Sequence, residues 1–120
     1  MTGTINSNTY INCLVNTTVT IANNAQTSDA ASLGGGLQLV AVQLPATLTS
    51  TAMTFTGSTD GSTYVAVYAM DGAAAYSITV GAARIVPVDI RVFAGLAYVK
   101  CVAGSAEGGE RIITLITRPV

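Results

Sequence analysis

The sequence contains no histidine and no tryptophan, and few of its 120 residues are charged. Five basic and six acidic side chains give a formal net charge of -1 at pH 7. Without histidine, the chain has no imidazole to serve as a general base or as a metal ligand. Without clustered Lys and Arg, it has no basic surface for the phosphates of nucleic acids. We therefore expect no nucleic-acid partner, no metal and no cofactor.

Long hydrophobic runs are also missing, although 50% of the residues are hydrophobic and the mean hydropathy is +0.55. No apolar run approaches the roughly 18 residues that predict a membrane-spanning helix. The polar segment 1–8 has neither the basic region nor the apolar core of a secretory signal. We expect a chain that is made in the cytoplasm and does not enter a membrane.

What the sequence does contain is an alternation of apolar and polar residues with a period of two. This pattern recurs in short segments rich in Val, Ile and Thr, which is typical of β-strands. No segment keeps a period of 3.6 over 12 residues, so the pattern predicts a single helical turn at most, at residues 89–95. The expected strands are 10–15, 18–22, 37–43, 52–56, 63–70, 76–80, 84–88, 96–102 and 111–117.

Turn residues separate these segments. The Asp-Gly pairs at 60–61 and 71–72 flank the strand expected at 63–70, because glycine tolerates positive φ and Asp binds nearby backbone. The polar stretch 23–32 is interpreted as one long surface loop. Pro87 has no N–H, so its strand is expected at a sheet edge or at a bulge.

Many short strands separated by turns predict an all-β fold. We expect a single-domain β-sandwich, jelly-roll-like, with about eight or nine short antiparallel strands. The domain is expected to cover residues 9–120, with residues 1–8 as a polar N-terminal arm.

The two cysteines, Cys13 and Cys101, both fall at positions of expected strands that face inward. They could form a disulfide between the first and the penultimate strand, or remain two free buried thiols. We favour free thiols, because cytosolic cysteines stay reduced.

No catalytic group emerges from the remaining polar residues. We interpret the six carboxylates as turn and rim residues, Glu107 within the turn at 104–109, and Lys100 as a solvent-facing residue on a sheet surface. Tyr64 and Tyr68 share one face of the expected strand 63–70, and Tyr98 could join them. Such rings form either a sugar-stacking platform or, as we favour, part of the core or a subunit interface. We expect that the chain is not an enzyme.

Several blocks resemble small virion proteins of tailed bacteriophages. These are Leu44-Pro45 and residues 48–55, 58–64, 80–89, 93–100 and 111–118, so the resemblance covers about two thirds of the chain. In those proteins the blocks form consecutive strands of a sandwich. The resemblance implies a capsid cement or decoration protein on the capsid surface of a virion. It also implies the major capsid protein as partner and a homo-oligomer, with a trimer favoured.

Two other functions stay open: a carbohydrate-binding module of a phage fibre or tail, and an internal tail or connector protein. The low charge favours a chain that is covered by other subunits, because interface cores are depleted in charge. The segments 1–8 and 23–36 are the expected contact regions, since they are too long for tight turns and lack a core pattern. The candidate contact residues are Thr4, Ile5, Asn6, Ser7, Asn8, Asn24, Leu33, Tyr64 and Tyr68.

Overall fold

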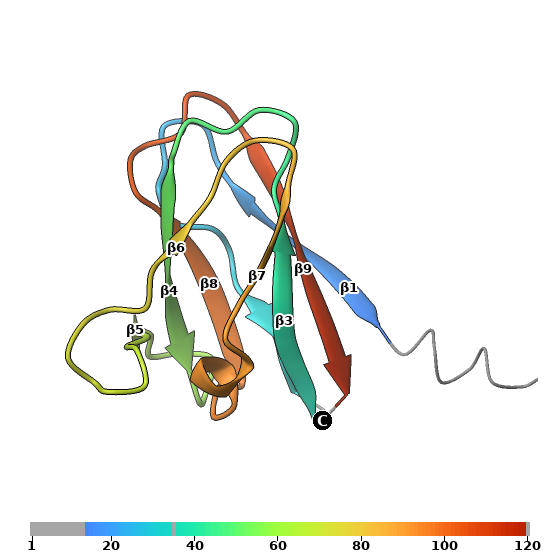
Figure 1. Ribbon diagram of the computed structural model, residues 1–120, viewed down its shortest axis with the longest axis vertical. Coiled ribbons are helices and arrows are strands. Elements are labelled where there is room, and N and C mark those ends of the chain that lie inside the picture. Colours follow the sequence, from blue (N-terminus) through green and yellow to red (C-terminus); the bar gives the residue numbers. More distant parts are fainter. Residues whose placement is uncertain (1–13, 35, 120) are drawn as a thin grey trace, which may run out of the picture.

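The computed structural model describes residues 14–34 and 36–119, which form two antiparallel sheets packed face to face (Figure 1). The first, here called the β1 sheet, has the strand order β1-β9-β3-β7. Its strands are β1 (Val15–Ile21), β9 (Arg111–Pro119), β3 (Leu37–Gln43) and β7 (Ile85–Pro87).

The second sheet, here called the β8 sheet, has the order β2-β8-β4-β5, with β6 also paired to β4. Every strand pair in both sheets is antiparallel in the part of the chain described. The expected all-β sandwich is therefore confirmed. The strands of this sheet are β2 (Ala31–Ser32), β8 (Tyr98–Ala103), β4 (Ala52–Ser58), β5 (Val65–Ala66) and β6 (Ile78–Thr79).

The core lies between the sheets because the period-two pattern sends alternate side chains to one face. Burial alternates along β4 and β8, and again along the second half of β9. The largest apolar side chains that are nearly inaccessible come from both sheets: Ile21, Leu39, Met53, Phe55, Val99, Ile113 and Leu115.

A short 3-10 helix, η1 (Ile90–Phe93), closes one end of the sandwich near β3 (Figure 1). The Asp89 carboxylate caps it by accepting the Arg91 N–H at 3.1 Å. Phe93 is 1% exposed, and its ring meets that of Phe55 edge to face at a centroid distance of 5.0 Å. The Tyr76 ring lies 5.7 Å from Phe93, and its hydroxyl accepts the Asp89 N–H at 2.8 Å. The expected helical turn is confirmed, and it carries an aromatic plug.

Several expected elements differ from the structure. The strand expected at 76–80 is reduced to Ile78–Thr79, and β1 (Val15–Ile21) bridges the strands expected at 10–15 and 18–22. The strand expected at 63–70 is reduced to Val65–Ala66, because the chain turns back at 67–76 and bonds to itself. The stretch 23–32 is not one surface loop, since it contains β2, which pairs with β8. Its Ser28 is buried, and the hydroxyl accepts the Cys101 N–H at 2.9 Å. The alternation of apolar and polar residues is weak in this stretch. Backbone hydrogen bonds, and not side-chain burial alone, keep the stretch in place.

Pro87 lies in β7, which forms an edge of the β1 sheet as expected. Cys101 is a free thiol with no accessible surface, and burial raises its pKa to about 12. Cys13, its expected counterpart, is outside the described residues, as is the segment 1–8. None of the described elements is a helix with the length and apolarity needed to cross a membrane.

The aromatic plug gives a first prediction. Phe93→Ala is expected to lower the free energy of unfolding by about 3–5 kcal/mol, because it leaves a cavity against Phe55 and Tyr76. Ile90→Ala is the matched control in the same turn, since Ile90 is 39% exposed and should cost less than about 1 kcal/mol. Urea unfolding of both variants measures the difference, and equal losses would show that η1 does not close the core.

Candidate interaction surfaces

The outer side of the β1 sheet carries little charge, with Arg118 near the end of β9. Val19 and Ile21 of β1 and Ile113, Leu115 and Thr117 of β9 are buried, and the residues that alternate with them along each strand point away from the core. On this side Ile85 is 59% exposed and Ile112 is 52% exposed. We call this surface the β1-sheet outer face. Its residues are Asn16, Thr18, Thr20, Gln38, Ala41, Gln43, Ile85, Pro87, Ile112, Thr114, Ile116 and Arg118.

This face carries little charge in part because the carboxylates of the chain are used elsewhere. Five of the six accept a backbone N–H, and so hold a loop or a turn instead of facing solvent freely. The Asp60 carboxylate accepts from Thr63 and Ser62, and these bonds lower its pKa. Asp29 accepts the N–H of Thr20, Asp71 that of Ala73, and Asp89 that of Arg91. Glu107 accepts the N–H groups of Thr49 and Ser50.

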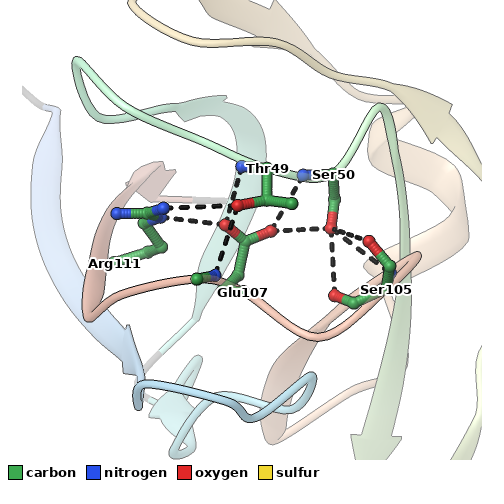
Figure 2. Close-up of polar contacts among 6 residues, drawn as sticks. Thr49, Ser50, Ser105, Glu107 and Arg111 are labelled. Carbon is green, nitrogen blue, oxygen red and sulfur yellow. Dashed lines mark hydrogen bonds and ion pairs between the residues drawn. The ribbon is translucent and has the colours of Figure 1, made fainter.

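Glu107 has the most extensive of these contacts (Figure 2). One carboxylate oxygen accepts the Thr49 N–H at 2.8 Å and Arg111 Nε at 2.9 Å. The other accepts the Ser50 N–H at 3.0 Å and the Ser50 hydroxyl at 2.6 Å. The Ser50 hydroxyl in turn accepts the Ser105 N–H at 3.3 Å.

The backbone of Glu107 adds a third loop to this network. Its N–H donates to the Ala25 carbonyl at 3.0 Å, and its carbonyl accepts the Asn24 N–H at 2.9 Å. The loops β1–β2, β3–β4 and β8–β9 are therefore joined at one residue. Since these loops connect strands of both sheets, Glu107 fixes one end of the sandwich.

Glu107 lies in the connection at 104–109 as expected, but it does not face solvent there, because it is only 1% exposed. Burial alone would raise the pKa of this carboxylate, but the hydrogen bonds from Ser50, Thr49 and Arg111 outweigh it. The net effect lowers the pKa to about 2. Its short glycine-rich turn showed no sign of burial, and the partners at 49–50 are distant in sequence.

The three tyrosines considered for sugar stacking do not form one stacked strand face. Lys100 lies on the outer side of the β8 sheet as expected, and its Nζ is 4.2 Å from the centroid of the Tyr64 ring. The Tyr98 ring lies close to Gly61, where a φ of 82° requires glycine and an added Cβ would come within 3.0 Å of the ring. Tyr68 lies apart on the 67–76 loop.

The 67–76 loop forms the second exposed apolar surface. It protrudes beyond β5 at one side of the sandwich (Figure 1), where Tyr68 is 51% exposed and Met70 is 60% exposed. Val65 in β5 is 65% exposed. Large apolar side chains on a protruding loop are typical of partner contacts.

The remaining expected contact residues have different outcomes. Asn24 is exposed at a turn with a φ of 67°, a conformation that asparagine tolerates. Leu33 is 3% exposed and packs in the core, so the expectation that it contacts a partner from the surface is corrected. Its apolar side chain fills the space between the sheets beside β8. Thr4, Ile5, Asn6, Ser7 and Asn8 lie outside the described residues.

The described residues contain no group of three His, Cys, Asp or Glu side chains arranged to hold a metal ion. Two shallow grooves lie at the surface, one beside β7 around Arg84 and one around Leu96. Neither is lined by a tyrosine or by a carboxylate. The described surfaces present mainly apolar and hydroxyl groups.

The fold and its surfaces define a small all-β sandwich of two antiparallel sheets. The crystal structure of the SPBc2 prophage-derived protein YomS has a similar fold, with a TM-score of 0.52 and 16% sequence identity. The similarity covers 87% of this chain and 93% of that chain, so the likeness extends over nearly the whole sandwich. No family model and no curated protein matches the sequence.

The Glu107 network predicts an acid-dependent loss of stability. The carboxylate has a pKa of about 2 in the folded chain against 4.5 for an ordinary glutamate, so its ionised form stabilises the fold. This contribution is complete above pH 4.5 and is lost as the pH falls toward 2.

Glu107→Gln is expected to lower the free energy of unfolding at pH 7 by roughly 2–4 kcal/mol and to weaken its dependence on pH below 4.5. The matched control is Glu110→Gln, at an exposed position in the same connection. Urea unfolding at several pH values between 2 and 7 makes the test. The assigned role would be contradicted if the free energy of unfolding of Glu107→Gln fell below pH 4.5 as steeply as that of the parent protein.

Proposed function

We propose that this chain is a structural protein of a tailed-bacteriophage virion that binds the assembled capsid and stabilises the head. The observation that carries the proposal is the β1-sheet outer face, which exposes Ile85 and Ile112 without a charged side chain between them. A surface of this kind is typical of a subunit that other proteins cover. The fold shared with a prophage-derived protein supports a phage origin.

The physical mechanism is mass action on the assembled shell. A protein that binds the capsid lattice, and not free capsid subunits, stabilises the lattice in proportion to its occupancy and affinity. The accessible surface of 6312 Å² is large enough for several contacts of about 800 Å² per partner. The major capsid protein is the partner in this proposal, and the capsid surface of the virion is the location.

The jelly-roll form of the sandwich belongs to this proposal. It is supported by the strand order, because β1, β9, β3 and β7 form one sheet while β2, β8, β4 and β5 form the other. In this order most consecutive strands lie in opposite sheets, as two interlocked Greek keys require. We also propose that the protein acts through binding alone, without catalysis.

Removal of the protein from virions tests the role directly. Virions treated with a mild chaotrope are expected to lose this protein and then to lose heat resistance, while rebinding of the purified chain restores it. The measurement is the temperature at which encapsidated DNA becomes accessible to a dye. Stripped heads that keep the stability of untreated heads would overturn the cement role.

A surface variant tests which face binds. Ile112→Lys places a charge in the β1-sheet outer face and is expected to weaken binding to stripped heads at least about tenfold. Thr79→Lys is the matched control, because Thr79 is an exposed strand residue of the other sheet. Both variants should melt within a few degrees of the parent protein. Equal occupancy of the two variants would show that the β1-sheet outer face is not the binding face.

A further inference from the structure

Asp29 covers one end of the free edge of β1, and the rest of this edge has no backbone partner among the described residues. Among the described residues β1 pairs only with β9, so it forms an edge of its sheet (Figure 1). At Thr20 this edge is occupied, because the Thr20 N–H donates to the Asp29 carboxylate at 2.7 Å. The Asp29 N–H donates in return to the Thr20 carbonyl at 3.2 Å. The backbone groups of Thr20 therefore point away from β9.

The direction of the Thr20 groups fixes the direction of the others. In an antiparallel pair, alternate residues turn their N–H and C=O toward the same neighbour. Asn16 and Thr18 therefore direct their backbone groups to the same free side as Thr20. This leaves two N–H donors and two C=O acceptors in a row, outside the part of the edge that Asp29 covers.

This open edge lacks the features that usually prevent pairing. Natural edge strands are very short, or carry proline or inward charges. The other edges of the described sheets follow this rule, since β7 has three residues and contains Pro87, and β2 and β5 have two residues each. β1 has seven residues, and none of them is charged or proline.

We propose that this edge pairs with β1 of a second copy of the chain, antiparallel and about a two-fold axis. Asn16 lies opposite the partner subunit's Thr18, and Thr18 lies opposite the partner subunit's Asn16. Two β1 sheets then continue as one sheet across the contact.

This register is selected by the groups on β1. It uses all four open backbone groups of each copy and leaves the Asp29 contact at Thr20 in place. It also sets Val15, which is 43% exposed, opposite the partner subunit's Val19 on the inner side of the sheet. Thr17 meets the partner subunit's Thr17, and pairs of threonines across strands are favourable.

The symmetry of this contact restricts the size of the assembly. A two-fold contact is self-complementary, so every copy that uses it has one partner. Alone it gives a dimer, and combined with a three-fold contact it gives six copies. The assembly in solution therefore contains an even number of chains.

Thr18→Pro tests the contact. Proline removes the outward N–H and blocks the approach of a strand, but it leaves the pairing with β9 intact because Thr18 does not bond to β9. The matched control is Thr18→Val, which keeps the N–H and the β-branched shape. The full-length protein and both variants are compared by sedimentation velocity and light scattering over a range of about 1–100 µM.

The parent chain and Thr18→Val are expected to show an even number of copies, and Thr18→Pro to dissociate to half that number or to pair at least about tenfold more weakly. Thermal melting confirms that Thr18→Pro is folded. If Thr18→Pro does not fold, Asn16→Pro removes the other open N–H of the edge, and Asn16→Val is its control. A parent chain that stays monomeric at the highest concentration, an odd number of copies, or equal association of the proline and valine variants overturns the proposal.

Discussion

The buried carboxylate of Glu107 is the contact on which the arrangement of the two sheets most depends. It is one of few charged groups in the chain, and it accepts hydrogen bonds from Thr49, Ser50 and Arg111 while its backbone bonds to the β1–β2 loop. An ionised group with this little access to solvent persists only where its bonds replace those of water. At the other end, η1 closes the core with an aromatic ring. The sandwich is thus fixed by a polar contact at one end and an apolar one at the other.

The low charge of the chain and the small number of charges on the β1-sheet outer face have a common explanation. Most carboxylates serve to hold turns, and two of the five cations are engaged in ion pairs, Arg91 with Asp89 and Arg111 with Glu107. A third, Lys100, lies over the ring of Tyr64. Little charge remains for the broad surfaces of the sheets, which present threonine and isoleucine instead. Such a surface stays soluble through hydroxyl groups and offers apolar area to another protein.

The long strands of the core could be predicted from the sequence, because 52–56 and 111–117 continue a period of two and 37–43 is a mostly apolar run. The end of the strand expected at 63–70 could not be predicted. The alternation of apolar and polar residues continues into a segment where the chain reverses, and backbone hydrogen bonds hold this reversal. The sequence did not predict β2, because a strand of two residues is too short to show an alternation of apolar and polar residues. The burial of Glu107 depends on partners nearly sixty positions away, and a local pattern contains no information on such a contact. The exposure of Tyr68 and the burial of Leu33 likewise depend on where the loops pack.

The position of β9 in its sheet has a consequence for the way the chain folds. β9 comes last among the described strands in the sequence, yet it lies between β1 and β3 and pairs with both. Until β9 is synthesised, β1 has no partner among the other described strands, and its sheet lacks the strand that joins β1 to β3. Contacts between residues so far apart in the sequence form slowly. Until they form, an unpaired strand can pair with other chains. The step that completes the sheet is thus also the step that ends the period in which the nascent chain is vulnerable to aggregation.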